Sequence, residues 1–394
     1  MTEKIALGFG NNIDYEIAWN SEAIKRLILE YDIHDDELGI DHSIRSERDL
    51  VVSVLGFMKI GSGGERFVAS SDIIEEFSRH FENKITLGGT SVRAAIAMRK
   101  LGYTSVLHLV TMNDQVRKLI PSDSPFVCSG TEEKSYPHLI VQFGKNICVQ
   151  ANDIDICTKH ATRLIYHSDS VNIEMNINED FADLVTDAKV FLISGFNAMH
   201  SEELFLDRIE SLKRIMDKLP GDALVYYEDA GFHEPRFSPL MVNALADYID
   251  IYALNEDELQ GYLHRQVDLL DVGQVRQALA DLKRQFPIPT IIVHTQYWAL
   301  AYGDNTAQYS KALKSATTLA TTRFCYGDDI TLEHYQKIEN FAPNPMGAEF
   351  ADKINGAVDA HFCCVPVAYI EQQIGTTVGL GDAFVGGFLP MLLG

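Results

Sequence analysis

Residues 189–230 decide the fold class, and they read KVFLISGF (189–196), EELFLDRIESLKRIMDKL (202–219) and ALVYYEDA (223–230). The first and third stretches are short and mostly apolar, as buried strands are. The second stretch carries apolar side chains at helical spacing. A strand, a helix and a second strand in this order predict a parallel strand pair with the helix packed on one face.

The same alternation continues in both directions along the chain. KIALGFG (4–10) and TSVLHLV (104–110) come before this unit, and YIDIYALN (248–255) and TIIVHT (290–295) come after it. We therefore expect an α/β fold with a mostly parallel sheet and helices on both faces. Ligands bind such sheets beyond the carboxyl ends of the strands.

A second, smaller domain is expected from two stretches of different character. Within residues 138–167, HLIVQF, KNICVQA and TRLIYH follow one another without helices, which is typical of an antiparallel sheet. We also expect a strand in DLVVSVLGFMKIG, near residues 50–70. The predicted small β-rich lid domain comprises about 15–85 and 126–174, and the large domain 1–14, 86–125 and 175–394.

Composition limits the classes of partner. The chain has 394 residues, 46% of them hydrophobic, and a formal net charge of −23, which disfavours nucleic acid and anionic membranes. We see no signal peptide and no apolar run of about 18 residues. The six cysteines lack C-x-x-C and zinc spacing, so we expect reduced thiols and a cytoplasmic location. A monomer and a small homo-oligomer both remain open.

Candidate chemistry begins at GTTVGLGDAFVGGF (375–388), where Asp382 directly follows Gly379-Leu380-Gly381. One interpretation is a tight turn in which the aspartate caps a helix. The other is that the N–H groups of the turn bind an anion while Asp382 takes a proton from the attacking nucleophile. That second arrangement would be a phosphoryl-transfer site.

Acidic residues follow two of the predicted strands. Glu228 ends one strand, and Asn255 and Glu258 belong to NEDEL (255–259) after the next. Capping of a helix by Asn255 explains the acids after it but not Glu228. Because carboxylates repel a phosphate unless a cation lies between them, we predict Mg²⁺ or another divalent cation at Glu228, Glu258 and Asn255.

The glycine pair Gly88-Gly89, before the helical stretch that begins near Thr90, has two interpretations that stay open. The pair either allows close packing of a helix on a sheet or brings backbone against a small polar ligand. In GSGGERFV (61–68), the spacing alone predicts that Glu65 and Arg66 form a solvated charge pair in a flexible loop.

Taken in order, these motifs resemble the ADP-dependent glucokinase and phosphofructokinase family of the ribokinase-like superfamily. The resemblance runs from about residue 7 to the end of the chain. It rests on FGNNID (9–14), GSGGE (61–65), LGGTSVRAA (87–95), NDIDICTKHATRLIYHSD (152–169), LISGFNAM (192–199), NEDEL (255–259), HTQYWAL (294–300), ATTRFCYGD (320–328) and VPVAYIEQQIGTTVGLGD (365–382).

This resemblance implies a three-layer sandwich with a lid, and transfer of the terminal phosphoryl group of Mg-ADP to a sugar hydroxyl, releasing AMP. It implies that Asp382 is the base and that Gly379 and Gly381 help to form the anion hole. It further implies nucleotide contacts from His294, Thr295, Val378, Gly379 and Leu380. The implied sugar contacts are Asn12, Asp14, Glu65, Gly88, Gly89, Thr90 and Arg163.

The chain departs from the family pattern at two places. Tyr226 stands where the family usually has a histidine two residues before the glutamate, and Thr90 and Ser91 stand where it usually has an amide residue and Ala-Gly. Both departures put the substrate in question more than the chemistry. An ATP-dependent ribokinase-type kinase and a catalytically silent sugar- or nucleotide-binding protein are the alternatives.

The acceptor sugar has two candidates. Glu65 favours an unphosphorylated hexose, glucose, because a carboxylate accepts hydrogen bonds from sugar hydroxyls. Lys159, Arg163 and Arg66 could instead clamp the phosphate of fructose 6-phosphate, since arginine suits bidentate contacts with phosphate.

Overall fold

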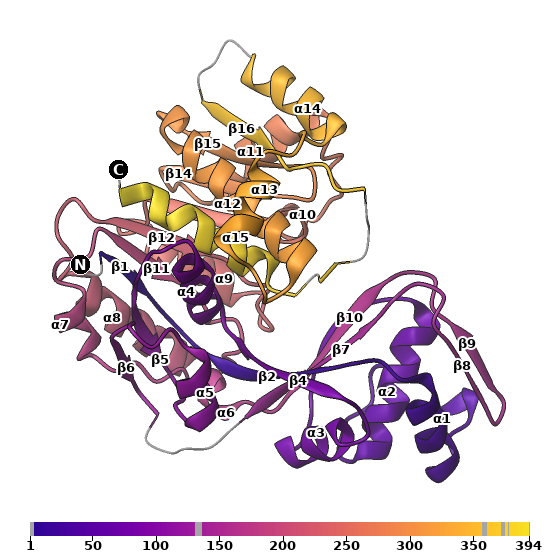
Figure 1. Ribbon diagram of the computed structural model, residues 1–394. Helices are drawn as coiled ribbons and strands as arrows, with labels where there is room; N and C mark the ends of the chain where they lie inside the picture. The colour runs from indigo at the N-terminus through magenta and orange to yellow at the C-terminus, as the bar shows by residue number, and fades with distance from the viewer. Residues whose placement is uncertain (1–3, 131–135, 357–360, 372–374, 377, 394) are drawn as a thin grey trace.

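The protein is described from a computed structural model, which covers residues 4–130, 136–356, 361–371, 375–376 and 378–393. Within these residues the chain forms two units, each built around its own sheet, and it crosses between them several times (Figure 1). We call them the large unit and the small unit, and their sheets the large sheet and the small sheet.

The large sheet has nine strands in the described residues and is mostly parallel. Its order is β16-β15-β14-β13-β12-β11-β1-β5-β6, and only β15 runs antiparallel to its neighbours. The strands are β1 (Ile5–Leu7), β5 (Val106–Leu109), β6 (Phe126–Cys128), β11 (Val190–Ile193), β12 (Leu224–Glu228), β13 (Ile251–Asn255), β14 (Thr290–His294), β15 (Trp298–Gly303) and β16 (Phe362–Pro366).

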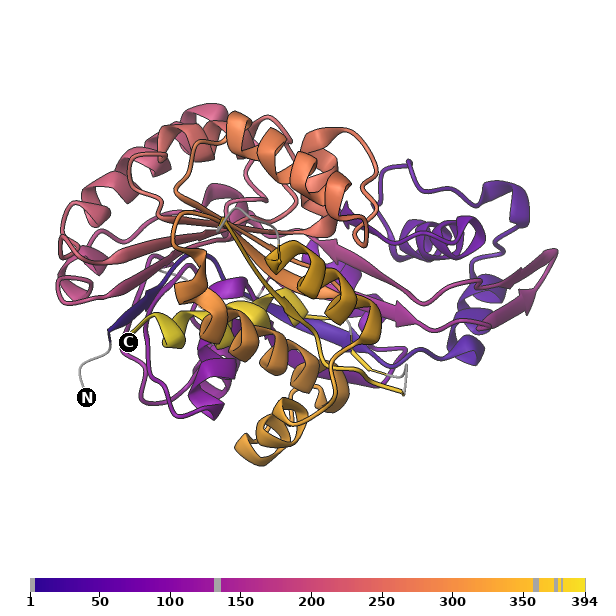
Figure 2. The same cartoon turned by 90° about the horizontal axis from the view of Figure 1, so that it is seen from above.

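Helices cover both faces of the large sheet (Figure 2). One face packs against α7 (Phe181–Leu184), α8 (Glu202–Met216), α9 (Phe237–Ala244), α10 (Glu256–Leu263), α11 (Val272–Gln285) and α14 (Pro345–Asn355). The other packs against α4 (Thr90–Lys100), α5 (Asp114–Leu119), α12 (Ser310–Tyr326) and α15 (Leu380–Phe388). The short α6 (Ser170–Glu174) adds Val171 to the first of these faces, and α13 (Leu332–Glu339) packs through Tyr335 on a small cluster that includes Leu319 of α12. The strands that we expected from apolar runs are present because both of their faces are covered.

The small unit has a separate apolar core. Its sheet has the order β3-β10-β7-β2-β4 in the described residues, and α1 (Ser21–Glu30), α2 (Glu47–Ile60) and α3 (Ser71–Ser78) pack against it. The strands are β2 (Asn12–Ile17), β3 (Gly64–Phe67), β4 (Asn83–Gly88), β7 (Pro137–Phe143) and β10 (Thr162–His167), and β8 (Cys148–Ala151) forms a hairpin with β9 (Ile154–Cys157).

The prediction of a strand near residues 50–70 is wrong for most of that stretch. Residues 47–60 form α2, which begins after Ser46, whose side chain accepts a hydrogen bond from the N–H of Asp49, and ends at Gly61 with φ 76°. Almost every side chain of its middle turns is buried, so the run lacks the polar face that marks an amphipathic helix. Periodicity alone does not distinguish a helix from a strand in an apolar run that lacks a polar face.

Two boundaries between the units differ from the expected ones. β6 pairs in parallel with β5, so residues 126–128 lie in the large sheet rather than in the small unit. β2 and β4 pair with each other in the small sheet, so residues 12–14 and 86–88 lie in the small unit. Only residues 8–11 separate β1 from β2, and only Gly89 separates β4 from α4. The units are therefore joined here without the longer loop that a sequence pattern detects.

The expectation that the cysteines are reduced thiols is also wrong for one pair. Cys148 and Cys157 form a disulfide across the β8–β9 hairpin, while Cys128, Cys325, Cys363 and Cys364 are free. The two strands place the bonded residues opposite each other, and their spacing in the sequence matches no redox motif. Among the described residues no helix combines the length and the apolar character needed to cross a membrane.

Candidate active site

The glycine turn lies at the N-terminus of α15. Gly379 has φ 69°, the helix begins at Leu380, and Asp382 is its third residue, with 20% of its side chain exposed. The first N–H groups of a helix have no acceptor within it and lie at its positive end. The turn therefore presents hydrogen-bond donors and a partly exposed carboxylate at one place. Residue 377 of the same motif lies outside the described residues.

Two buried arginines flank this turn. A Cβ atom on Gly379 would lie 2.8 Å from Arg93 Nη1 and 2.9 Å from Arg323 Nε, so only glycine fits there. Arg323, from α12, donates from Nε to the carbonyl of Val378 at 2.7 Å and from Nη1 to Asp328 at 2.7 Å. The turn is thus held from one side by α4 and from the other by α12.

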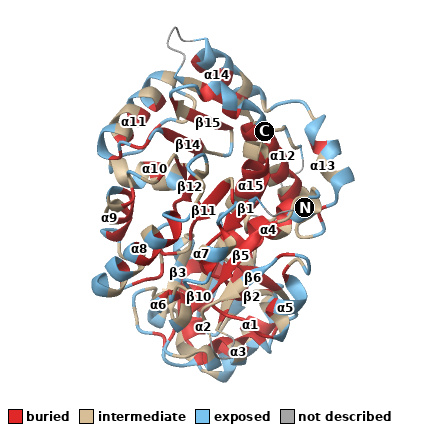
Figure 3. Cartoon of the chain, turned by 90° about the vertical axis from the view of Figure 1, so that its left-hand side faces the viewer, coloured by how far each residue is buried: buried red, intermediate tan, exposed pale blue. Residues whose placement is uncertain are grey.

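The rest of α15 is held between the same two helices. A Cβ atom on Gly386 would lie 2.8 Å from the carbonyl oxygen of Ala94, and one on Gly387 would lie 2.8 Å from that of Ser315. These glycines allow α4 and α12 to approach α15 closely, and residues 383–388 are buried (Figure 3). Asp382 is therefore presented by an element with little freedom to shift.

Arg93 links the turn to the small sheet. Its Nη2 lies 2.6 Å from Asp14 Oδ2 and 3.4 Å from Glu16 Oε1, and its Nε lies 3.8 Å from Asp382 Oδ2. Burial lowers the pKa of Arg93, but Asp14, Asp382 and Glu16 outweigh burial and raise it, so the guanidinium stays charged. Asn12 Nδ2 also donates to Asp14 Oδ1 at 2.6 Å.

The predicted sugar residues Asn12 and Asp14 lie within β2. Asn12 is paired with Gly88 across β2 and β4, and a Cβ atom on Gly88 would collide with Asn12 Nδ2. Gly89 has φ 96°, and a Cβ atom there would lie 2.7 Å from the carbonyl oxygen of Gly10. Thr90 is the first residue of α4. The glycine pair therefore has a packing role, and it brings backbone beside Asn12.

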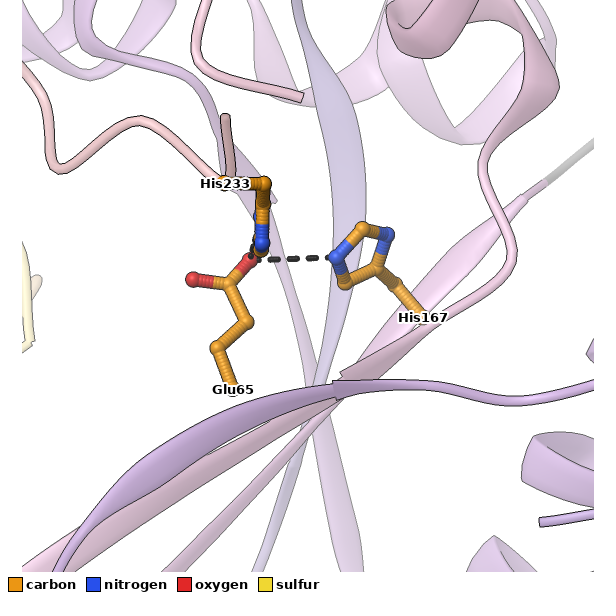
Figure 4. A group of neighbouring side chains, drawn as sticks. All are labelled: Glu65, His167 and His233. Carbon is orange, nitrogen blue, oxygen red and sulfur yellow. Dashed lines mark ion pairs between the residues drawn. The ribbon is translucent and has the colours of Figure 1, made fainter. Parts of the chain in front are cut away.

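Glu65 and Arg163 line one cleft of about 420 Å³ together with Gly63, Gly64, Thr162 and Ile165. Glu65 lies on β3 and Arg163 on the neighbouring β10. Glu65 Oε1 also lies 3.1 Å from His167 Nε2 and 3.3 Å from His233 Nε2 (Figure 4). Burial raises the pKa of Glu65, but the two imidazoles outweigh burial and hold it below its usual range, so the carboxylate is ionised.

His138 connects this cleft with the Asp14 group. Its ring stacks on that of His167 with 4.6 Å between centroids, and it is paired with Asp14 across β7 and β2. Burial lowers the pKa of His138, but Asp169, Asp14 and Glu65 together raise it. The candidate sugar residues therefore follow one another across adjacent strands of the small sheet.

Glu228 ends β12 in a buried position between two partners. It accepts a hydrogen bond from the hydroxyl of Tyr226 at 3.1 Å, and His294 Nε2 lies 3.0 Å from its other oxygen. Burial lowers the pKa of His294, but Glu228 and then Glu258 raise it. Tyr226, the departure from the family pattern, thus contacts the glutamate directly. His294 also lies near the turn, since its Cε1 would be 3.7 Å from a Cβ atom on Gly381.

Asn255 and Glu258 form a capping box at the start of α10. Asn255 Oδ1 accepts from the N–H groups of Asp257 and Glu258, and Glu258 Oε2 accepts from the N–H of Asn255 at 2.8 Å. Burial, Asp229 and Glu228 raise the pKa of Glu258 to about 8. Asn255 and Glu258 therefore cap the helix, and the Glu258 carboxyl also lies close enough to Glu228 for their charges to interact.

Thr295 occupies the turn between β14 and β15. Its hydroxyl donates to the carbonyl of Trp298 at 2.9 Å and accepts from the N–H of Tyr297 at 3.1 Å. This residue therefore fixes the turn that follows His294.

Sequence reasoning missed four side chains that the structure places at these groups, namely Arg93, Arg323, His167 and His233. A signal existed for Arg93, because a single arginine among the small residues of TSVRAAIAM must be paired with acids if that helix face is buried. No signal existed for the histidines, which are far apart in the sequence and meet only through the fold.

Comparison with known proteins assigns the family. The model of the ADP-specific phosphofructokinase/glucokinase conserved region matches residues 3–389. No curated protein sequence gives a significant match.

Similar solved structures support the fold. A phosphofructokinase from Pyrococcus horikoshii OT3, solved with AMP, is 17% identical with a TM-score of 0.77 over 99% of this chain and 98% of that chain. An ADP-dependent kinase in complex with fructose-6-phosphate and ADPβS is 14% identical, with a TM-score of 0.74 over 99% and 94%. The adenosine kinase of Sinorhizobium meliloti is 11% identical, with a TM-score of 0.53 over 100% and 89%.

The expected α/β fold is confirmed by these likenesses. The family match spans both units and includes every predicted site residue. Because of this family match, the chain is a phosphotransferase with an alcohol group as acceptor. The chain belongs to the ADP-specific phosphofructokinase/glucokinase family.

Proposed function

We propose that the protein transfers the terminal phosphoryl group of Mg-ADP to a hydroxyl of an unphosphorylated hexose, glucose, and releases AMP. The observation that carries this proposal is the position of Asp382, at the N-terminus of α15 and 3.8 Å from the arginine that holds Asp14. This position supports the proposal because a carboxylate, the first N–H groups of a helix and the Arg93–Asp14 pair lie close together.

Phosphoryl transfer requires positioning and charge neutralisation more than covalent participation by the protein. In the proposed mechanism Asp382 accepts the proton of the sugar hydroxyl as that oxygen attacks phosphorus. The N–H groups of Gly379, Leu380, Gly381 and Asp382 hold the transferred phosphoryl group, because they lie at the positive end of α15. Arg93 positions Asp14 and Asp382 relative to each other and balances their charges.

The buried acids near His294 fit a divalent cation. Glu228 is 6% exposed, and the raised pKa of Glu258 reflects the proximity of Asp229 and Glu228 in a buried setting. A cation relieves this repulsion, and Mg²⁺ bound mainly through water and phosphate oxygens suits a pair of carboxylates. When bound, Mg²⁺ neutralises the charge of the nucleotide phosphates. Glu228 and Glu258 would hold it, with Asn255 fixing the Glu258 side chain.

The proposed sugar lies in the cleft that Glu65 and Arg163 line. Glu65 is ionised there, so it accepts hydrogen bonds from sugar hydroxyls and repels a sugar phosphate. Arg66 Nη2 donates to the carbonyl of His42 at 2.7 Å, and Arg66 is not among the residues that line the cleft. These two observations favour glucose over fructose 6-phosphate.

We also propose that the small unit acts as a lid which excludes water, the competing phosphoryl acceptor, when both substrates are bound. The cytoplasmic location and the lack of a nucleic-acid partner, both expected from the sequence, stay predictions.

The test uses purified protein with Mg²⁺, the nucleotides ADP, ATP and GTP, and the acceptors glucose and fructose 6-phosphate. AMP formed from ADP with glucose supports the proposal. AMP formed only with fructose 6-phosphate overturns the assigned acceptor, and turnover with ATP alone overturns the assigned donor. A folded protein that turns over no pair would be a catalytically silent member of the family.

A further inference from the structure

Glu65, His167 and His233 come together from three distant parts of the chain (Figure 4). Glu65 lies on β3 and His167 at the end of β10, both in the small sheet, whereas His233 lies in the connection from β12 to α9 in the large unit. Their ligand atoms all lie within 4.8 Å of one another. In the part of the chain that the structure describes, this is the one group of three His, Cys, Asp or Glu side chains so arranged.

The distances between these atoms match those between ligands of one ion. Glu65 Oε1 lies 3.1 Å from His167 Nε2 and 3.3 Å from His233 Nε2. Ligands at about 2.0–2.1 Å from a tetrahedral Zn²⁺ are roughly 3.3 Å apart. The trio therefore needs little movement to surround an ion of that size, with the fourth position left for water.

Within the described residues, both histidines of the trio carry a buried ring nitrogen without a hydrogen bond of ordinary geometry, although each nitrogen lies within ion-pair distance of Glu65. His167 is buried, and neither of its ring nitrogens has a hydrogen-bond partner among the described residues. The same holds for His233 Nε2. A buried nitrogen without a hydrogen bond is costly, and an ion bound by all three side chains would give these nitrogens a partner.

The donor set selects the class of ion. Two imidazoles and one carboxylate suit Zn²⁺ and similar transition metals, whereas Mg²⁺ prefers oxygen ligands and water. This site is therefore distinct in chemistry from the proposed Mg²⁺ site at Glu228 and Glu258. With 33% of the Glu65 side chain and 16% of the His233 side chain exposed, an ion can enter from the cleft.

We propose that Glu65 Oε1, His167 Nε2 and His233 Nε2 bind one Zn²⁺ ion, which joins the small unit to the β12–α9 connection of the large unit. Because Glu65 also lines the cleft proposed for the sugar, bound Zn²⁺ withdraws that carboxylate from the sugar. This second statement rests on the proposed function, whereas the binding of the ion does not.

The test measures Zn²⁺ binding to the full chain by calorimetry, after removal of metals with a chelator. The unaltered protein should bind one Zn²⁺ at this site, and Glu65→Gln and His233→Gln should each weaken that binding by about tenfold or more. His200→Gln is the matched control, because His200 is exposed and its ring lies 6.3 Å from that of His233, yet it is outside the trio. It should bind Zn²⁺ as the unaltered protein does.

Circular dichroism and thermal unfolding establish that each variant is folded before its affinity is compared. The proposal is overturned if the unaltered protein binds no Zn²⁺, or if both folded variants bind it with unchanged affinity. Glucose should weaken Zn²⁺ binding to the unaltered protein, because the two ligands compete for Glu65. Zn²⁺ binding that depends on the trio but ignores glucose would support the ion site and overturn the sugar role of Glu65.

Discussion

Arg93 and Asp382, on the adjacent helices α4 and α15, approach to 3.8 Å between Nε and Oδ2. The same guanidinium forms a buried ion pair with Asp14 of the small sheet. One side chain thus fixes the candidate base relative to a candidate sugar residue. Substitution of Asp382 should therefore affect mainly catalysis, whereas substitution of Arg93 should affect mainly the stability of the fold.

Asp382→Asn should lower kcat by orders of magnitude, because the amide does not accept the proton of the sugar hydroxyl. The side chain keeps its size, so ADP binding should stay nearly unchanged. Steady-state kinetics and ADP titration by calorimetry check the two halves of this prediction. Activity retained in the variant would remove Asp382 from the role of base.

Arg93→Met should destabilise the fold by about 3–5 kcal/mol, because it leaves the buried carboxylate of Asp14 without its partner. Arg99→Met, on the same helix, is the control. Arg99 pairs with Asp123 at the surface, where 42% and 46% of the two side chains are exposed, so its loss should change the stability far less. Urea unfolding gives both values, and equal losses would contradict the importance of the buried pair.

Glu228→Gln should raise the Mg²⁺ concentration needed for half-maximal activity and leave the Michaelis constant for the sugar unchanged. The reason is that Glu228 lies with Glu258 and His294, apart from the cleft that Glu65 lines. Kinetics at varied Mg²⁺ and varied sugar separate the two effects. A change confined to the sugar constant would show that Glu228 belongs to the sugar site.

His108 should make the protein less stable in mild acid. Burial lowers its pKa from 6.5 to about 3, and its Nε2 accepts a hydrogen bond from the N–H of Asn178 at 2.8 Å. At a pH between the two pKa values, 6.5 and about 3, the unfolded chain therefore binds a proton at His108 and the folded protein does not. Stability is full above the unfolded pKa and falls as the pH drops below it, by up to roughly 1.4 kcal/mol per pH unit.

Urea unfolding between about pH 7 and pH 5 checks this. His108→Gln keeps a hydrogen-bond acceptor and should flatten the pH dependence. His160→Gln, at an exposed position, should leave it as in the unaltered protein. The same slope in all three proteins would rule out His108 as its source.

The large sheet could be predicted from the sequence because its strands are buried on both faces and alternate with amphipathic helices. That pattern identified β11, α8 and β12. It failed at α2, where burial around most of the helix removed the polar positions on which a helical assignment depends.

The glycine turn and Asp382 were also predictable, since their chemistry lies in adjacent residues. Arg93, Arg323 and the Glu65–His167–His233 group were not. Their significance lies in partners tens to hundreds of residues away, brought close by strand pairing and helix packing. A single sequence records the residue types but not these distances.

The strand order of the small sheet has a consequence for how the chain acquires its structure. Ile13 pairs with Pro137, and Gly64 pairs with Leu164, so each pairing waits for residues made much later. The intervening chain includes α4 and β5, which belong to the large unit. Neither unit is therefore a continuous fragment that could be expressed by itself. Pairings this distant in sequence slow folding. Because β3 pairs with β10, the small sheet cannot form completely until the chain has been synthesised past residue 164.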